Sequence, residues 1–234
     1  MRAPLFCVLV SLLAVGARTA ELPAAQAAER EDAAAIARAV EAHYQHAVTL
    51  RAVFLESYSA GRSELRAESG TVYFRRPGLM RWDYTSPQKK LFLVDGRYAW
   101  FYIPSDHTVS RASAHKSADW RTPFALLTGK ARLSDLCRAI SLVPSQGGPS
   151  SPAPGDAVLD CSPKHKEAFL DAEIEVDRMD RIVSVLVKQP GDVTVEVRFG
   201  NWRENIPLSK SLFRFQPPPG VAVVSQQGLA GSMD

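Results

Sequence analysis

Two four-residue motifs of this chain have the spacing of a serine nucleophile and its lysine base. Ser86 precedes Lys89, and Ser113 precedes Lys116, in the pattern SxxK. Hydrolases that use this pair place the serine at the start of a helix, whereas both motifs here fall in segments that we expect to be loops. The chain contains no HExxH, no GxSxG and no glycine-rich phosphate loop. The sequence therefore predicts no catalytic site.

A pair of histidines, His43 and His46, lies three residues apart in a segment with helical periodicity. Residues with this spacing share a helix face, so the two imidazoles could begin a metal site. The sequence offers no third ligand, because the remaining histidines, His107, His115 and His165, are scattered. We therefore expect a solvated or half-buried histidine pair, no metal and no cofactor.

The first residues have the composition of an export signal. Arg2 is followed by an apolar run over residues 5–15, which is typical of a secretory signal peptide and too short to span a membrane. Cleavage after Ala17 and cleavage after Ala27 both fit, and an uncleaved anchor is the alternative. Because Cys7 lies inside the apolar run, we expect no lipid-attachment cysteine. The expected organisation is a leader and loose N-terminus over 1–27, one domain over 28–224 and a disordered tail over 225–234.

The other two cysteines, Cys137 and Cys161, lie in segments with strand character that flank a loop rich in Pro, Gly and Ser over residues 144–155. An exported protein meets an oxidising compartment, where such a pair can form a disulfide. A bridge across this loop would contribute about 3 kcal/mol to stability. A pair of buried free thiols is equally compatible with the sequence. Neither a CxxC motif nor a nearby histidine pair suggests zinc.

Length and composition describe one globular domain. Of the 234 residues, 46% are hydrophobic and 23% are charged, and the formal net charge is only +3. Acidic and basic residues are mixed, without the block of Lys and Arg that a nucleic-acid surface requires. We therefore expect a monomer that does not bind nucleic acid.

Hydrophobic periodicity predicts many short strands and few helices. Ile36, Val40 and Tyr44 recur every four residues and predict a helix over 33–47. Alternation of apolar and polar residues between turn signals predicts the strands. The expected strands are 49–58, 64–69 leading into 71–75, 79–84, 91–94, 97–103, 107–111, 133–143, 157–162, 170–176, 182–187, 193–199 and 212–215.

The strands near the middle of the chain are apolar on both faces. In 91–94 and 100–103 every residue is hydrophobic, so both sides of the sheet need cover from other elements or from an apolar ligand. The connections are short throughout, which favours antiparallel neighbours. We predict a mainly β protein of the α+β class, in which a single antiparallel sheet curves like a barrel and thereby protects its edges.

Several motifs, in their order and spacing, resemble one protein family over roughly residues 33–224. The matching stretches are Phe74-Arg75-Arg76-Pro77, Arg81-Trp82-Asp83-Tyr84, Val94-Asp95-Gly96, Trp100-Phe101-Tyr102, 122–127 and 213–221. The family is the outer-membrane lipoprotein carrier protein, LolA, whose members handle lipid-modified proteins in the periplasm. The resemblance implies an unclosed β-barrel whose mouth is capped by a helical lid.

The resemblance also implies roles for individual residues. Arg76 matches the arginine that bonds to backbone carbonyls of the lid and holds the empty form closed, although an ordinary surface arginine beside a turn would look the same. The segment 122–127, with Thr122 expected as the N-cap of a short apolar helix, would be the lid or a permanent plug of the core. Its candidate lid residues are Phe124, Leu126 and Leu127. The candidate cavity residues, which could equally be core, are Met80, Trp82, Tyr84, Leu93, Trp100 and Tyr102.

These expectations lead to a function. A LolA-like protein would be a periplasmic chaperone that takes acylated lipoproteins from an inner-membrane ABC-type releasing complex and delivers them to an outer-membrane receptor. The receptor itself is one alternative, but the expected lack of a lipid-attachment cysteine argues against it. A periplasmic sensor that binds lipid or misfolded lipoprotein and regulates a membrane signalling protein is the second alternative, and a hydrolase is the third. A sensor usually carries an additional domain, for which this chain has little room.

Overall fold

The structure, a computed structural model, is mainly β. It describes residues 24–61, 63–114, 124, 126–143, 152–165 and 169–225. The first strands are β1 (Thr49–Ala60), β2 (Ser63–Arg75), β3 (Leu79–Ser86), β4 (Lys90–Val94), β5 (Tyr98–Ile103) and β6 (Thr108–Ser113). The later strands are β7 (Cys137–Leu142), β8 (Ala157–Pro163), β9 (Asp171–Val176), β10 (Ile182–Gln189), β11 (Val193–Glu204) and β12 (Ala222–Ser225). The helical pieces are α1 (Ala24–Gln45), η1 (Pro104–Asp106), α2 (Leu133–Leu136) and η3 (Lys210–Phe213).

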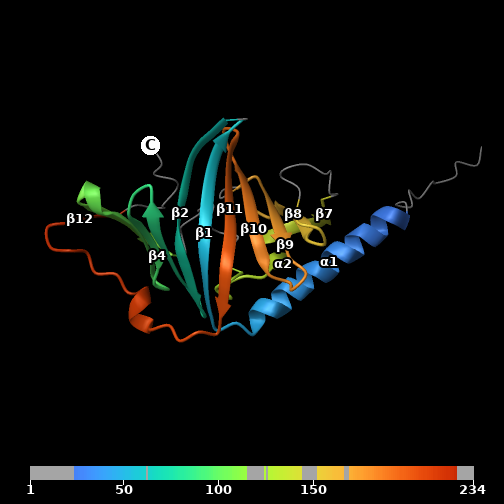
Figure 1. The fold of residues 1–234 in the computed structure, drawn as a ribbon, viewed down its shortest axis with the longest axis horizontal. Helices are drawn as coiled ribbons and strands as arrows, with labels where there is room; N and C mark the ends of the chain where they lie inside the picture. Colours follow the sequence, from blue (N-terminus) through green and yellow to red (C-terminus); the bar gives the residue numbers. More distant parts are fainter. Residues whose placement is uncertain are drawn as a thin grey trace, which may run out of the picture.

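All twelve strands of the described chain belong to one sheet. Its order is β12-β6-β5-β4-β3-β2-β1-β11-β10-β9-β8-β7, so the sheet begins and ends with unpaired edges rather than closing on itself (Figure 1). The predicted fold class, a single curved and unclosed sheet, is confirmed. One pairing departs from the expected antiparallel pattern, because β12 runs parallel to β6.

Strand β1 joins the beginning and the end of the domain. It pairs antiparallel with β2 on one side and with β11 on the other, and these three strands form the tall centre of the sheet (Figure 1). Phe54 of β1 lies opposite Phe199 of β11 and opposite Gly70 of β2. Residues directly opposite each other share a sheet face, so aromatic side chains from distant parts of the sequence meet at this centre.

Strand β2 runs without a break through Gly70, although the sequence suggested a lead-in followed by a separate strand. A Cβ atom at Gly70 would lie 2.0 Å from the carbonyl oxygen of Asp83 on β3. Only a residue without a side chain permits the two backbones to approach so closely. The register of the β2–β3 pair shifts at this same point, between Ser69 and Gly70.

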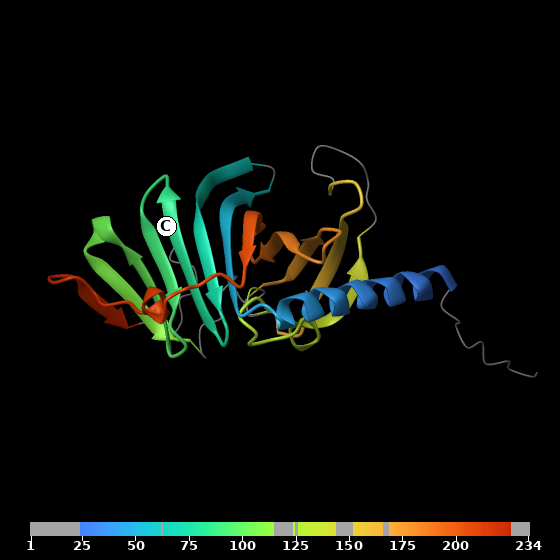
Figure 2. The ribbon, with the colours of Figure 1, turned by 60° about the horizontal axis from the view of Figure 1, so that its bottom comes forward.

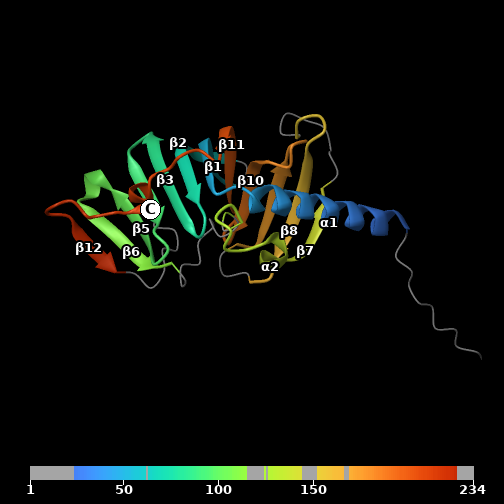
Figure 3. The same ribbon diagram turned by 90° about the horizontal axis from the view of Figure 1, so that it is seen from below.

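Helix α1 is longer than predicted. The sequence favoured 33–47, with a loose segment before it, but the helix begins at Ala24 because the alanine-rich segment has high helix propensity. It packs beside β7, across the half of the sheet that contains β7 to β11 (Figure 2, Figure 3). The buried stripe on its inward side is Ala33, Ala37, Val40, Tyr44 and, just beyond the helix, Ala47.

Tyr44 and His43 fix the end of α1 against the sheet. The backbone N–H of Ile182 donates a hydrogen bond to the Tyr44 hydroxyl over 2.9 Å, and burial raises the pKa of that hydroxyl. His43 Nε2 lies 2.9 Å from Glu204 Oε1 at the end of β11. The described chain holds no cluster of three metal-ligating side chains. The partner of His43 is the carboxylate of Glu204.

Two predicted strands are partly or wholly wrong. In 133–143, the first turn is the short helix α2, where the Asp135 carboxylate accepts from the backbone N–H of Arg132, and only Cys137–Leu142 is a strand. In 212–215, the first two residues belong to the 3-10 turn η3, which is capped by the Ser209 hydroxyl, and the other two form no strand. A local side-chain cap outweighs the strand propensity of a few apolar residues in both places.

The ends of the chain limit what is described. Residues 1–23 and 226–234 lie outside the described residues, and so do most of the predicted leader and tail. Residues 24–27 of the expected leader form the start of α1, and Ser225 of the expected tail ends β12. Neither helix in the described part of the chain has the length and hydrophobicity needed to cross a bilayer.

Candidate ligand-binding site

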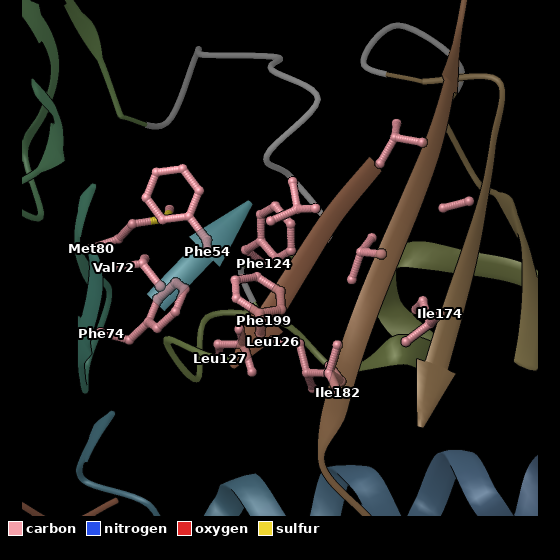
Figure 4. Close-up of a cluster of buried hydrophobic side chains, with 14 of the residues drawn as sticks. Phe54, Val72, Phe74, Met80, Phe124, Leu126, Leu127, Ile174, Ile182 and Phe199 are labelled. Carbon is pink, nitrogen blue, oxygen red and sulfur yellow. The ribbon is translucent and has the colours of Figure 1, made fainter. Parts of the chain in front are cut away.

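Aromatic side chains cover one face of the curved sheet, which we call the inner face. Trp82 of β3 is fully buried at its centre, with its ring 4.8 Å from that of Phe54 and 5.2 Å from that of Phe124. The Phe199 ring packs edge-on against Phe124 at 5.6 Å. Side chains from β1 to β3 and from β10 and β11 point toward one another across this space (Figure 4). The inner face is therefore a continuous apolar surface assembled from both halves of the sheet.

The six predicted cavity residues do not lie together. Met80, Trp82 and Tyr84 alternate along β3 and are buried on the inner face. Leu93, Trp100 and Tyr102 lie on the opposite face, which we call the outer face. A shared cavity lined by all six is thus wrong, because neighbouring residues of a strand point to opposite sides of its sheet.

The outer face has its own small apolar cluster. Leu93 and Trp100 pair across β4 and β5, and both are buried beside Leu91 and Val109. Phe215 covers them, with its ring 5.6 Å from Trp100 and 5.4 Å from Tyr102. Phe215 belongs to the C-terminal segment, residues 205–225, which crosses the outer side of β2 to β6 on its way to β12 (Figure 2). Of these predicted cavity residues, Leu93 and Trp100 therefore belong to the core of a second cluster, and the partly buried Tyr102 packs against it.

The predicted lid residues lie directly on the inner face. Phe124, Leu126 and Leu127 are each at most 2% exposed and point into the aromatic cluster (Figure 4). The described part of this segment, residue 124 and residues 126–129, forms tight turns, because Leu127 N–H donates to Phe124 O and Gly129 N–H donates to Leu126 O, each over 3.0 Å. We call it the lid segment. The expected N-cap Thr122 lies outside the described residues.

Two residues of the turn after β2 donate hydrogen bonds to the described lid segment. Arg76 Nη2 donates to the carbonyl oxygen of Leu126 over 3.4 Å, and the backbone N–H of Gly78 donates to Thr128 O over 3.0 Å. Gly129 makes room for the guanidinium, since a Cβ there would lie 2.8 Å from Arg76 Nη1. The structure brings the predicted latch, Arg76, to the predicted lid at Leu126, through a bond longer than the roughly 2.7–3.2 Å of most N–H···O hydrogen bonds.

The guanidinium of Arg76 is only partly satisfied. Its Nε is buried without a hydrogen-bond partner, and no carboxylate of the described residues forms an ion pair with it. Burial without a compensating charge lowers the pKa of Arg76. A buried donor that lacks a partner costs about 1–3 kcal/mol, so the contact of Arg76 with Leu126 leaves part of its hydrogen-bonding capacity unused.

A buried polar cluster at one end of the inner face was missed from the sequence. Glu56 is fully buried and accepts hydrogen bonds from the hydroxyls of Tyr58 and Tyr84, the latter over 2.7 Å. Glu68 lies opposite Glu56 on β2 and pairs with the buried Lys90. The signal was present in the alternation of β1, which places Glu56 in phase with apolar neighbours. The inner face thus has an apolar middle and a charged end.

Cys137 and Cys161 form a disulfide, with Cα atoms 5.4 Å apart. It links β7 to β8 and follows directly after α2, so it anchors the chain that leaves the lid segment. Of the two SxxK motifs, Ser86 and Lys89 are exposed at the end of β3, while Lys116 lies outside the described residues. Neither motif has the helix start that its chemistry needs.

Comparison of the sequence with known proteins finds the family that the motifs resemble. Residues 45–216 match the family model described as outer membrane lipoprotein carrier protein LolA. A protein of Nitrosospira multiformis named outer-membrane lipoprotein carrier protein is 30% identical over 189 residues, which cover 78% of this chain and 84% of that protein. A protein of Chromobacterium violaceum with the same name is 29% identical over 208 residues, covering 88% of this chain and 95% of its own length.

Among solved structures, an uncharacterized conserved protein from Thermus thermophilus aligns with a TM-score of 0.52 at 13% identity. The alignment covers 83% of this chain and 99% of that one. Similarity at this identity concerns the fold alone.

Proposed function

Because this chain belongs to the LolA family, whose members are lipoprotein carriers and not enzymes, we propose that it carries lipoproteins across the periplasm with their acyl chains held against the inner face. The cargo would come from an inner-membrane ABC-type releasing complex and pass to an outer-membrane receptor. The names of the curated relatives support a carrier over a receptor or a sensor. The resemblance seen in the sequence, and with it the expectation of a protein that is not an enzyme, is confirmed.

The physical problem of such a carrier is the exposure of hydrocarbon to water. An acyl chain of about 15 methylenes exposes surface worth roughly 12 kcal/mol on transfer to water. The inner face offers Trp82, Phe54 and Phe199 as an apolar replacement for the bilayer. Aromatic rings and Met80 supply a large contact area with adaptable packing, which suits chains of differing length.

The single observation that carries the proposal is the position of the lid segment on the inner face. Three apolar side chains, Phe124, Leu126 and Leu127, occupy the inner face where an acyl chain would lie. Arg76 and Gly78 donate hydrogen bonds to this segment, and the bond from Arg76 is 3.4 Å long. A ligand of equal apolar area can therefore replace the lid residues at little net cost, and closure of the lid then favours release.

Native mass spectrometry of the full chain purified from periplasm tests this proposal. We expect a population of the protein with an intact acylated protein bound. A matched sample treated with detergent, which competes for acyl chains, should lose that population. Recovery of the protein with only free phospholipid or fatty acid, in cells that export lipoproteins, would contradict a lipoprotein carrier and favour lipid transport or sensing.

A further inference from the structure

A pocket of about 290 Å³ lies behind the lid segment, where α1, the lid segment and α2 meet. It is separate from the aromatic middle of the inner face, although Arg76 borders it. The charged side chains that line it are three cations and two carboxylates: Arg76, Lys130, Arg132, Glu41 and Asp135. The pocket thus carries a net positive charge beside the partly satisfied guanidinium.

The two carboxylates of the pocket are engaged elsewhere. Asp135 accepts from the backbone N–H of Arg132 over 3.0 Å, as part of the cap of α2. Glu41 accepts from the backbone N–H of Ser134 over 3.4 Å. Neither forms an ion pair with Arg76 in the described chain, and the three cations of the pocket exceed its two carboxylates by one charge.

Lys130 is placed to share a ligand with Arg76. Its alkyl chain lies over Gly78, where a Cβ atom would be 2.3 Å from Lys130 Cε, two residues beyond Arg76. The glycine at position 78 therefore lets the lysine stem pack down toward the latch. Arg132 lines the same pocket, and its ion pair with Asp135 is exposed and 3.5 Å long, so it leaves the guanidinium available.

We propose that this pocket binds a phosphate-class anion on Arg76, Lys130 and Arg132, and that the bound anion releases the lid segment. A guanidinium gains from an oxyanion the attraction between opposite charges, which a neutral carbonyl does not supply. The planar fork of Arg76 matches two phosphate oxygens at once, and its partnerless Nε gains an acceptor. The anion therefore draws Arg76 away from Leu126. Binding stands on the pocket alone, whereas the effect on the lid rests on the proposed function.

The first experiment measures binding of inorganic phosphate to the full chain, by titration followed with the Arg Nε–H signals in NMR spectra. Chloride at matched ionic strength is the reference. We expect one Nε–H signal, assigned by its loss in Arg76→Lys, to shift with phosphate and not with chloride. Lys130→Gln should weaken phosphate binding about fivefold, since it removes one partly exposed charge contact. The control Arg138→Gln makes the same charge change on exposed β7 and should leave the affinity unaltered.

The second experiment measures hydrogen exchange of the Gly78 and Gly129 amides, which donate to lid carbonyls or lie within the lid. Phosphate should accelerate their exchange in the wild type, and less so in Lys130→Gln. Vesicles of phosphatidylcholine with a minority of phosphatidylglycerol replace phosphate in a parallel arm. A response to the vesicles alone would identify a lipid headgroup as the source, and a response to phosphate alone would identify a free anion.

The outcomes separate the two proposals. If neither phosphate nor vesicles shift the Arg76 signal, or if Arg138→Gln weakens binding as much as Lys130→Gln, the anion site is refuted while the carrier function stands. If phosphate binds with the expected dependence on Lys130 but no acylated protein is ever found on the chain, the carrier function fails and the anion site survives. Binding without faster exchange at Gly78 would refute the release step.

Discussion

The two faces of the sheet both carry apolar clusters under a covering segment, but the covers are held in different ways. On the outer face, the C-terminal segment is fixed by Arg75 Nη1 to Leu208 O at 2.8 Å, by Arg81 Nη1 to Leu212 O at 3.0 Å, and by the ladder between β12 and β6. On the inner face, the lid segment has the 3.4 Å bond from Arg76 and one backbone bond. The outer cover joins the sheet as strand β12, whereas the described part of the lid segment forms turns and contributes no strand.

Two adjacent arginines make this difference visible. Arg75 is the last residue of β2 and Arg76 is the first of the turn that follows, and their side chains reach carbonyls of opposite covers. Chemically the two interactions are the same kind of charge-assisted bond. The two bonds differ in length, 2.8 Å for Arg75 and 3.4 Å for Arg76. They also differ in surroundings, because only the segment that Arg75 contacts is also paired with the sheet, through β12. The comparison teaches that the same residue type can contact a cover that is a strand of the sheet and a cover that is not.

The largest expected effect comes from removing the aromatic centre of either face. Trp82→Ala should lower the free energy of unfolding by about 4 kcal/mol, because it leaves a cavity among fully buried rings. Trp100→Ala on the outer face should also destabilise the protein. Urea unfolding measures both losses, and binding of a fluorescent acyl probe separates the faces. Only Trp82→Ala should alter probe affinity, and an equal change in Trp100→Ala would break the distinction between the faces.

The disulfide should matter next, and only for the inner cover. Replacing Cys137 and Cys161 together by serine should cost about 3 kcal/mol for a bridge that spans 24 residues. Because the bond anchors the chain after the lid segment, hydrogen exchange should rise at α2 and the lid segment. Exchange at β12 should stay unchanged. An increase of hydrogen exchange in β12 as large as that in the lid segment would show that the two covers are not independent.

Gly129→Ala tests the space beside the latch. The residue has φ +70°, and its new Cβ would also meet the Arg76 guanidinium, so we expect a loss of about 2 kcal/mol and a looser lid. Gly191→Ala is the matched control, with φ +82° and no atom within 4 Å of a Cβ. It should cost about 1 kcal/mol from backbone strain alone. Equal losses of stability in the two variants, measured by thermal unfolding, would mean that the Arg76 guanidinium moves aside without cost.

The smallest effect on stability is expected at the two arginines. Arg75→Leu should cost about 1 kcal/mol, in keeping with a normal hydrogen bond, and Arg76→Leu should cost less, because its bond is long and its Nε lacks a partner. In a lipoprotein transfer assay the order should reverse, with Arg76→Leu impairing release or reloading and Arg75→Leu near wild type. Transfer by Arg76→Leu at the wild-type rate would remove Arg76 from the mechanism.

The sequence predicted the fold class well because alternation and turn residues are local signals. Where β4 and β5 are apolar on both faces, that alternation is lost, and nothing local assigns a face. Leu93, Trp100 and Tyr102 were therefore placed with Trp82, although Phe215, more than a hundred residues from Trp100, decides their side. The proximity of Arg76 and Leu126 is likewise non-local, and it came from the family resemblance rather than from any pattern.

The charged end of the inner face shows the opposite case. Its signal was local, since Glu56 stands in phase with Phe54 and Tyr58 along β1, but its partners come from β2, β3 and β4. A glutamate within an apolar alternation can mean a misplaced strand or a buried network. Only the register between strands distinguishes these, and register is set by the whole sheet.

The glycine at position 70 has a consequence for how this protein can change over generations. Any side chain there would strike the backbone of β3 at Asp83, and the residues on either side of Asp83 are Trp82 and Tyr84. A substitution at position 70 would therefore first displace Trp82 on the neighbouring strand. Position 70 should therefore accept almost no substitution, even though glycine has no side chain to contribute to binding.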